Sequence, residues 1–496
     1  EKRKQDVKIY VIEAALLILG WVFVPFYSRS MVYTMPEFLE RRYNPQSRTI
    51  LSVISLVSYV LTKVAVTVYA GGLVFQQVFG IKELWGIDFF WIAAIGLVVL
   101  TALYTIFGGM KSVLYTSVLQ TPILLLGSLI ILVLGFKELG GWDEMMRVCG
   151  AVTVNDYGDT MTNLIRSNDD ANFPWLGALI GSAIIGFWYW CTDQFIVQRV
   201  LSGKNEKEAR RGTIFGAYLK LLPVFLFLIP GMIAFALHQK YIGAGGEGFL
   251  PMLANGTANA DAAFPTLVAK LLPAGVKGLV VCGILAALMS SLASLFNSSA
   301  MLFTIDFYKR FRPETPEKKL VGIGQIATVV IVILGILWIP IMRSVGDVLY
   351  TYLQDVQSVL APGIAAAFLL GICWKRTSAQ GGMWGLIAGM IIGLTRLGAK
   401  VYYSNAGEVA DSTFKYLFYD MNWLFFCGWM FLFCIIVVIV VSLATEAPTA
   451  EKIQGLVFGT ATKEQKAATR ASWDHWDIIH TVIILAITGA FYWYFW

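Results

Sequence analysis

A lysine within an apolar segment, Lys220 in GAYLKLLPVF, is the first side chain of this sequence that could do chemistry. If the segment crosses a membrane, its charge is costly to bury, and such charges usually have a function. The ammonium would then donate hydrogen bonds to the oxygens of a polar ligand. Alternatively, a lysine near the end of a span extends its ammonium to the membrane surface, and both interpretations stay open. Lys63 in VLTKVAV is a weaker case, which structural pairing explains equally well.

Serine hydroxyls gather in the segment AALMSSLASLFNSSA, in which Ser290, Ser294 and Asn297 share one face of a helix. Hydroxyls in membrane helices often bond to the preceding turn or hold two helices together. The alternative is a site for an alkali cation, which needs several oxygen ligands. The adjacent hydroxyls of Ser290 and Ser291 would supply two of them, and carbonyls of a broken helix would supply more.

Three polar side chains, Gln354, Asp355 and Gln357, lie in the middle of the apolar segment VLYTYLQDVQSVLAPG. So many polar groups do not fit a surface that faces lipid. We therefore expect them to line a cavity or to pair within a bundle of helices.

The stretch GFWYWCTDQFIVQR, residues 186–199, places a run of aromatics ahead of Asp193 and Gln194. A carboxylate and an amide at the end of an apolar span need either a ligand or a protein partner. Gly181 and Gly186 precede the polar residues, and their spacing suits either an unwound helical segment or the tight packing of two helices.

The composition indicates that these segments do lie in a membrane. The chain has 496 residues, is 57% hydrophobic and only 14% charged, and has a mean hydropathy of +0.68. This combination is typical of an all-α polytopic membrane protein, and about twelve windows of roughly 20 apolar residues are long enough to cross a bilayer. They lie at about 10–26, 50–79, 89–107, 113–134, 175–191, 214–237, 276–303, 320–342, 348–372, 383–401, 423–443 and 478–496.

The placement of charge predicts the topology. If each span crosses once, all the basic clusters fall on one side, which the positive-inside rule makes cytoplasmic. The loop 137–174 falls on the other side, with three basic residues against seven acidic ones. The clusters are Arg41, Arg42 and Arg48; Arg199, Lys204, Lys207, Arg210 and Arg211; Lys309, Arg310, Arg312, Lys318 and Lys319; Lys375 and Arg376; and Lys463, Lys466 and Arg470.

The beginning of the chain does not fit this topology. The same count puts EKRKQD outside the cell, against the rule, and the sequence starts with Glu1 and shows no signal-peptide pattern. We therefore expect one or more spans to precede residue 1, with an unusual but complete chain as the alternative.

Other chemistry finds little support in the sequence. The six cysteines lie mostly inside spans and at no metal or disulfide spacing, so they resemble small apolar residues. The three histidines form no cluster, and no nucleotide-binding motif is present. We therefore expect no cofactor and no ATP-driven step, and no set of nucleophile, base and acid predicts an enzyme.

Five motifs in order resemble the sodium:solute symporter family, with the sodium/glucose and sodium/galactose cotransporters as the nearest branch. They are YTMPEFLERRY, WYWCTDQFIVQR, AYLKLLP, MSSLASLFNSSAMLFTIDFY and FLLGICWKR, and the resemblance runs from about residue 16 to at least 400. It implies a leucine-transporter-like fold of five plus five helices in inverted repeat. Residues 10–134 would then form an incomplete first repeat, 175–372 the second, and 383–496 peripheral C-terminal helices of a single transport domain.

The resemblance also implies a site for a sugar. Tyr189 matches the aromatic that closes over the inner face of the sugar, with Trp190 as a neighbouring ring that positions it. Lys220 and Gln354 match the lysine and glutamine that bond the sugar, and Tyr350 matches an aromatic of the outer gate.

Two departures from the family affect the sugar site. Gly186 stands where relatives carry a polar contact residue, so that contact is lost. The glutamate that the family uses before its second helix aligns with Ile9, and Glu13, one turn later, is an alternative contact. Asp193, Gln194 and Arg199 would lie on the cytoplasmic continuation of the helix, where we expect them to pair rather than to touch sugar.

For the coupling ion, the resemblance implies sodium held by the carbonyl of Ala287 and the hydroxyls of Ser290 and Ser291. Two more carbonyls would come from the helix expected before residue 1. Some relatives have a second sodium site, but its carboxylate and hydroxyl positions here are Ser117 and Ala293. We therefore expect one sodium per sugar.

The leading functional hypothesis is sodium-coupled symport of a monosaccharide across the cell membrane. Lys220 with Gln354 favours a neutral, hydroxyl-rich ligand, so inositol or another neutral solute is the alternative within transport. A sugar sensor or leak channel that binds without coupled flux is the alternative from another class. The sequence predicts no nucleic-acid partner and does not specify the oligomeric state.

Overall fold

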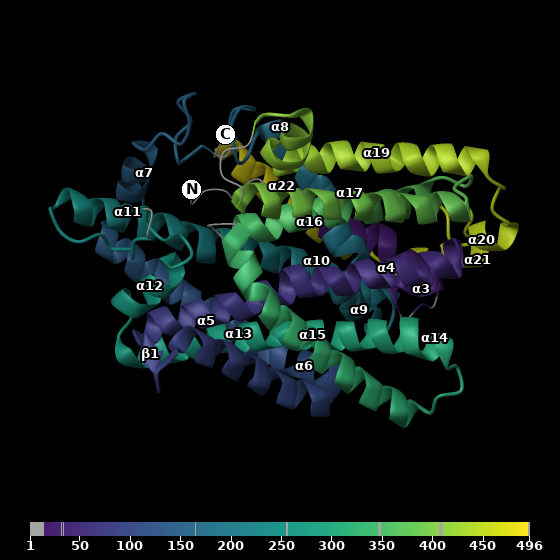
Figure 1. Cartoon of the computed structure of the whole chain (residues 1–496), viewed down its shortest axis with the longest axis horizontal. Helices are drawn as coiled ribbons and strands as arrows, with labels where there is room; N and C mark the ends of the chain where they lie inside the picture. The colour runs from purple at the N-terminus through teal and green to yellow at the C-terminus, as the bar shows by residue number, and fades with distance from the viewer. Residues whose placement is uncertain are drawn as a thin grey trace.

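A computed structural model of the chain describes residues 14–30, 32, 34–163, 165–253, 256–345, 349–405 and 410–494. Long helices run side by side along the longest axis of the molecule, with short helices and loops at both ends (Figure 1). The only named strands in the described residues are β1 (Glu83–Leu84) and β2 (Ile87–Asp88), which form a hairpin. The predicted all-α architecture is therefore correct.

Within the described part of the chain, six helical segments are π-helical, with one extra residue in the turn. A π-helical turn leaves backbone carbonyls without their usual partners and often marks a functional site. The segments are η1 (Leu19–Phe23), η2 (Tyr59–Val64), η3 (Trp188–Thr192), η4 (Val224–Leu228), η5 (Leu302–Tyr308) and η6 (Tyr416–Asp420).

The α-helices connect these segments or stand alone. In the first half of the chain they are α2 (Val24–Ser30), α3 (Met35–Arg42), α4 (Pro45–Ser58), α5 (Ala65–Phe79), α6 (Phe89–Leu139), α7 (Trp142–Gly150), α8 (Trp175–Phe187), α9 (Gln194–Leu201), α10 (Glu206–Pro223) and α11 (Ile229–Gly243). In the second half they are α12 (Ala263–Leu271), α13 (Ala274–Met301), α14 (Lys309–Phe311), α15 (Glu317–Val345), α16 (Leu349–Cys373), α17 (Ala379–Asn405), α18 (Thr413–Lys415), α19 (Trp423–Ala444), α20 (Ala450–Ile453), α21 (Lys463–Ala471) and α22 (His475–Tyr494).

Every predicted apolar window has a helix in its place. Nine described helices are long and apolar enough to cross a bilayer, and Ala14–Ser30 with Met35–Arg42 form a further pair bent by 72°. Two shorter apolar helices, Phe89–Leu103 and His475–Phe491, account for the remaining windows.

Local sequence signals set several of the helix ends. Thr34 caps α3, because its hydroxyl accepts from the backbone N–H of Glu37 at 3.2 Å. Asn44 caps α4 in the same way, and Pro45 follows it at the first helical position, where a missing N–H costs nothing. Gly80 ends α5 with a φ of 67°, a conformation that suits glycine.

The helix α6 contains two predicted windows rather than one. Its first residue, Phe89, packs edge-on against Phe79 at the end of α5, and its last, Leu139, accepts a hydrogen bond from Lys240 in α11. Both ends lie at the end of the molecule that carries β1 and α7 (Figure 1). The chain therefore crosses the molecule and returns within α6, as two separate spans require.

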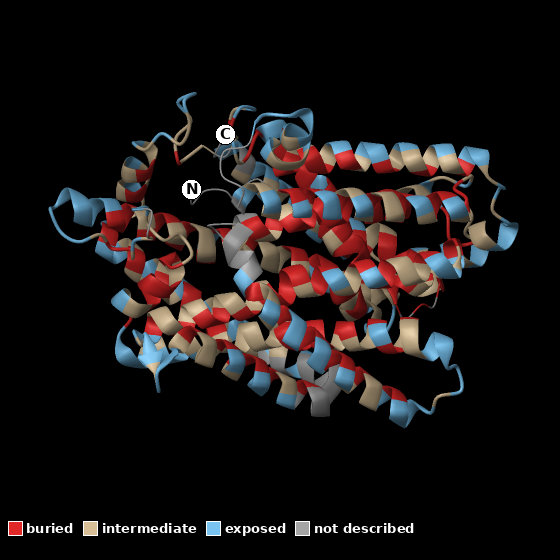
Figure 2. Ribbon diagram, in the orientation of Figure 1, coloured by how far each residue is buried: buried red, intermediate tan, exposed pale blue. Residues whose placement is uncertain are grey.

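The apolar faces of the outer helices are exposed as a lipid-facing surface would be. On α19, Trp429, Phe433, Ile436 and Val440 are exposed at helical spacing, while the opposite face is buried in the bundle (Figure 2). A helix that is hydrophobic on all sides but buried on only one is typical of a membrane span at the periphery.

Gly181 lies on the buried side of α8 and allows α19 to approach closely. A Cβ at this position would lie 2.8 Å from the carbonyl oxygen of Leu424. The helix runs without interruption through Gly181 and Gly186. The interpretation of these glycines as an unwound segment is therefore wrong, because the helix breaks later, at Asp193. The alternative, tight helix packing, is correct at Gly181, where a side chain would collide with α19.

The predicted basic clusters gather at one end of the molecule, which carries α3, α14, α20 and α21 (Figure 1) and is called the basic end below. Hydrogen bonds join segments that are far apart in sequence: Arg310 to the Pro45 carbonyl, Lys452 to the Glu40 carbonyl, Arg29 to Thr469 and Arg376 to the Thr445 carbonyl. This arrangement agrees with a single cytoplasmic side for all the clusters.

Candidate functional site

The helix that holds the stretch GFWYWCTDQFIVQR is broken inside the bundle. α8 continues into the π-helical segment η3, and the backbone becomes extended at Asp193, with φ −81° and ψ 125°. The chain then starts a new helix, α9, and the side chain of Asp193 accepts from the Phe195 N–H at 3.1 Å as its cap. A discontinuous helix of this kind exposes backbone groups within the membrane, where a transporter binds its ligands.

Tyrosine hydroxyls satisfy carbonyls in the π-helical segments that meet at this break. Tyr27 of α2 donates to the carbonyl oxygen of Cys191 in η3. Tyr352 of α16 donates to the carbonyl oxygen of Leu61 in η2 at 2.9 Å, and accepts from the indole N–H of Trp338 at 2.6 Å. These contacts hold the irregular backbone in one conformation, since a buried carbonyl without a partner is costly.

Lys220 lies against the broken helix. Its ammonium stands 5.2 Å from the ring centre of Trp190, which is buried, and Trp190 is packed edge-on against Tyr189 with ring centres 5.2 Å apart. The ammonium is therefore directed into the bundle, which favours a ligand-binding lysine over one that extends to the membrane surface. Three predicted site residues, Lys220, Trp190 and Tyr189, come together here.

Gln354 and Tyr350 lie near the start of α16, which packs against both α8 and η3. Gln354 is buried and Tyr350 is half-buried. The neighbouring Asp355 points to another helix, where its carboxylate lies 2.5 Å from the ammonium of Lys400 and 3.7 Å from the guanidinium of Arg396. Asp355, one of the three polar residues predicted in this span, therefore pairs within the bundle, as expected.

The serine segment of α13 combines two of the predicted roles. Ser294 donates to the carbonyl of Ser290 at 2.9 Å, and Ser298 donates to the carbonyl of Ser294 at 2.8 Å, which is the bonding to the preceding turn that membrane hydroxyls favour. The hydroxyl of Ser290 instead meets the hydroxyl of Ser117 on α6, at 2.5 Å. Ser291 is half-buried, as is Ala287 one turn earlier.

The face that carries Ser294 is directed toward α9. Gln198 donates from its amide nitrogen to the Ser294 carbonyl at 3.3 Å and to the Ser298 hydroxyl, and it accepts from the Asn297 amide at 3.5 Å. Arg199 donates to the hydroxyl of Ser294. The broken helix and the serine helix are therefore bonded directly to each other, on the side of the break nearer the basic end.

Asp193 is paired inside the protein, as the sequence predicts. Its carboxylate forms an ion pair with the ammonium of Lys63 and accepts from the hydroxyl of Tyr59 at 2.7 Å. All three side chains are buried. The structural-pairing interpretation of Lys63 is therefore correct.

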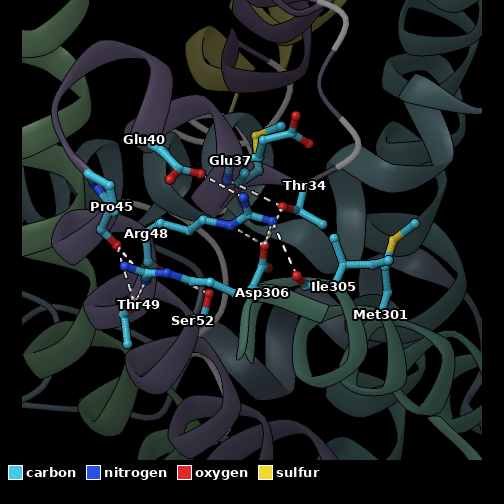
Figure 3. A network of polar contacts seen from close by, with 12 residues as sticks. Thr34, Glu37, Glu40, Pro45, Arg48, Thr49, Ser52, Met301, Ile305 and Asp306 are labelled. Atoms are coloured by element: carbon cyan, nitrogen blue, oxygen red, sulfur yellow. Dashed lines mark hydrogen bonds and ion pairs between the residues drawn. The ribbon is translucent and has the colours of Figure 1, made fainter. Parts of the chain in front are cut away.

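A second buried carboxylate, Asp306 in η5, organises the basic end (Figure 3). It accepts from the hydroxyl of Thr34 at 3.0 Å and from the guanidinium of Arg48, which also pairs with Glu40 at 2.6 Å. Gln194 adds a further connection, because its carbonyl oxygen accepts from the backbone N–H of Met35 at 2.8 Å. Helices from both halves of the chain are thus held together here.

Two predicted positions lie outside the described residues, and some paired residues were not predicted. Glu13 and Ile9 lie outside the described residues, so the alternative sugar contact at Glu13 stays a prediction. Tyr59 and Asp306 were missed, and Arg48 was predicted only as a member of a basic cluster. The carboxylate in the apolar run LFTIDFY was a usable signal for Asp306. Among the described residues, no group of three or more His, Cys, Asp or Glu side chains could hold a metal ion.

A membrane bundle with a helix broken at its interior is the architecture of a secondary transporter. Comparison with known proteins gives the particular class: residues 7–389 match the sodium:solute symporter family, and this chain belongs to that family. It is therefore a sodium-coupled solute symporter and an integral membrane protein, not an enzyme. The prediction of sodium as the coupling ion is confirmed at the level of the family.

Curated relatives cover most of the chain. It is 36% identical over 97% of its length to the sodium/mannose cotransporter SLC5A10 of Bos taurus, covering 83% of that protein. It is 35% identical over 90% of its length to the sodium/myo-inositol cotransporter 2 of Homo sapiens, covering 67% of that protein. With the sodium/glucose cotransporter 1 of Ovis aries the identity is 37% over 87% of the chain, and 66% of the relative is covered.

A solved structure shows the same fold. The substrate-bound, outward-open state of a sodium-coupled sialic acid symporter superposes with a TM-score of 0.70, covers 90% of this chain and 84% of its own, and shares 22% sequence identity. The leucine-transporter-like fold expected from the sequence is therefore confirmed.

Proposed function

We propose that this protein carries a monosaccharide into the cell together with one sodium ion, by alternating access. The observation that carries the proposal is the position of Lys220, whose ammonium lies over Trp190 beside Tyr189 at the break of the helix. A charged donor next to two aromatic rings packed edge-on inside a membrane bundle suits a ligand with an apolar face and several hydroxyls.

Each proposed sugar contact has a distinct chemical role. Tyr189 covers the apolar face of the ring, and Trp190 holds Tyr189 at right angles to itself, with an interplanar angle of 80°. Lys220 donates to sugar oxygens, and Gln354 both donates and accepts. Tyr350, at the start of α16, closes the outer side, and Glu13 is a further contact carried over from the sequence.

The sodium ion is proposed to lie against α13, between the carbonyl of Ala287 and the hydroxyls of Ser290 and Ser291. These are neutral oxygens, so the site carries no titrating charge of its own. The hydrogen bond between Ser290 and Ser117 supports a single sodium, because a hydroxyl rather than a carboxylate occupies the position where some relatives bind a second ion. A desolvated cation without a compensating charge is expensive to hold in a membrane.

The proposed division of the chain follows the family fold. Residues of about 10–134 and 175–372 form the two inverted repeats, and 383–496 lie at the periphery of a single transport domain. Alternating access is then the movement of one group of helices around the broken helix. The ion pair and hydrogen bonds around Asp306 would open when the cytoplasmic side opens.

The identity of the substrate has two candidates. Relatives named for mannose and glucose transport support a monosaccharide, and relatives named for myo-inositol support a cyclic polyol. Both ligands are neutral and rich in hydroxyls, so Lys220 and Gln354 suit either.

Counterflow in proteoliposomes tests the proposal. The full-length protein is loaded with unlabelled glucose, galactose, mannose or myo-inositol, and entry of the labelled solute is measured with sodium and with potassium. Sodium-dependent counterflow of a monosaccharide is expected. Preference for myo-inositol would favour the second candidate, and saturable sugar binding without any flux would mean that the protein is a sensor.

A further inference from the structure

We infer that Lys63 and Asp193 are positioning residues for the substrate: their ion pair holds the ring of Tyr189 in place and thereby sets the affinity for sugar, although neither residue touches it. The inference rests on the proposed function, in which Tyr189 covers the sugar. Lys63 comes from η2 and Asp193 from the break after η3, so the pair joins two irregular segments that are far apart in sequence.

Both oxygens of the Asp193 carboxylate are used to fix the break. One accepts from the hydroxyl of Tyr59 at 2.7 Å and from the backbone N–H of Phe195 at 3.1 Å, and the other pairs with Lys63. The hydroxyl of Tyr59 also accepts from the Phe195 N–H at 3.0 Å. Since Tyr59 and Lys63 are one turn apart on η2, the start of α9 is held to that segment at three points.

The ammonium of Lys63 connects this anchor to Tyr189. It lies 4.8 Å from the ring centre of Tyr189, 4.8 Å from that of Tyr59 and 4.5 Å from that of Phe195, with Trp188 at 5.9 Å. Cation–π attraction strengthens when the charge is desolvated, and Lys63 is only 7% exposed. The charge that pairs with Asp193 therefore also attracts the ring that is proposed to cover the sugar.

Stability alone does not account for this pair. Replacing a buried ion pair by apolar groups of similar size is often neutral or stabilising. Removing only one partner has a different effect, because it leaves a buried charge without compensation. Here a second cation, Arg199, lies 5.1 Å from the ring centre of Phe195, so loss of Asp193 alone would leave two cations together.

The decisive variant therefore neutralises both partners at once. Lys63→Met with Asp193→Asn removes both charges, and the asparagine oxygen still accepts from Tyr59 and Phe195. Four proteins are compared in proteoliposomes: the unmodified protein, this double variant, Tyr189→Ala, and the double variant combined with Tyr189→Ala. The KM for sugar and the maximal rate of sodium-driven uptake are measured for each. The matched control is Arg166→Met with Asp170→Asn, a buried ion pair outside the membrane spans.

If the pair acts through Tyr189, neutralising it raises the KM for sugar by about tenfold, and adding Tyr189→Ala then changes KM by less than about twofold, because coupled residues are not additive. The sodium dependence and the control variant stay as in the unmodified protein. Effects on KM that multiply as for independent sites, or an unchanged KM in the double variant, would overturn the inference.

Two further measurements keep the outcome clear. If the double variant does not reach the membrane, Lys63→Arg replaces it, since the charge is kept but the planar guanidinium does not fit among three rings. A raised KM with normal sodium dependence supports the inference, and an unchanged KM overturns it. If the proposed function is wrong, the unmodified protein itself will transport another solute. The same four proteins are then measured with that solute, so the two failures are distinguishable.

Discussion

The carboxylate of Asp306 lies 2.6 Å from the guanidinium of Arg48, although 258 residues separate them. The pair connects η5 to the first turns of α4 at the basic end (Figure 3). Asp306 has no exposed side-chain surface, and Arg48 is 13% exposed. The attraction is therefore only weakly screened by solvent.

Asp306→Asn is expected to destabilise the protein by about 3 kcal/mol, because removing one partner of a buried ion pair leaves the Arg48 charge with only the partly exposed Glu40 as its partner. Thermal unfolding in detergent measures the effect. Glu144→Gln is the control, since its partner Arg147 is 70% exposed and such pairs contribute little. Equal melting temperatures for Asp306→Asn and the unmodified protein would contradict the expected role of this pair.

Lys220→Ala and Gln354→Ala are each expected to weaken sugar binding without unfolding the protein. Leaving a buried hydrogen-bonding group of the ligand unpaired costs roughly 1–3 kcal/mol, which corresponds to a loss of about 5- to 150-fold in affinity. Equilibrium binding of labelled sugar measures it. Lys277→Ala is the matched control, because that ammonium donates to the Ala269 carbonyl at 2.6 Å and has no proposed ligand role. Unchanged affinity in both test variants would remove them from the site.

Ser291→Ala is expected to raise the sodium concentration needed for half-maximal uptake, because one of the proposed oxygen ligands is lost. Ser299→Ala is the control on the same helix, two turns further along and fully buried. The sodium dependence of uptake distinguishes the two, and it should vary little with pH for a site of neutral oxygens. If potassium drives uptake in the unmodified protein as well as sodium does, the proposed site is wrong.

The coupling ratio is expected to be one sodium per sugar, since Ser117 and Ala293 provide no carboxylate for a second ion. One positive charge then moves with each neutral sugar, so a tenfold change in the sugar gradient shifts the reversal potential by about 59 mV, against about 30 mV for two charges. A reversal-potential measurement on proteoliposomes decides between them. The smaller shift would mean that a second cation binds despite the hydroxyl at Ser117.

The loop before α8 is expected to lose stability in acid. Burial by itself raises the pKa of Asp170, but hydrogen bonds from the Phe173 and Asn172 N–H groups and the ion pair with Arg166 outweigh it and hold the pKa below its ordinary value. A carboxyl whose pKa is lower in the folded state stabilises it fully above the unfolded pKa of about 3.9 and loses this effect as the pH falls through the folded pKa.

Limited proteolysis of this loop should therefore accelerate as the pH falls below about 4, and Asp170→Asn should remove most of that dependence. Asp169→Asn is the neighbouring control, because that residue is exposed. The same acid sensitivity in Asp170→Asn and in the unmodified protein would show that another group is responsible.

Much of the fold and part of the site could be predicted from the sequence alone. Membrane spans need only long apolar windows, and the topology needs only the distribution of lysine and arginine, so both are local properties that the chain carries wherever it folds. Lys220 and the serine pair were also visible, because a polar side chain in an apolar segment is conspicuous. The sequence also predicted that Asp193 pairs within the protein, but it did not identify the partner.

Only the tertiary structure decided which polar groups meet. The partner of Asp193 is Lys63, 130 residues away, and the partner of Asp306 is Arg48, so no spacing in the sequence could reveal either pair. The glycines before the aromatic run indicated an unwound segment at the wrong place, since the helix breaks at Asp193. The irregular backbone is stabilised there by Tyr59 and Lys63, which come from another helix. Local patterns determine which segments cross the membrane, whereas pairing depends on how those segments pack, which is a property of the whole bundle.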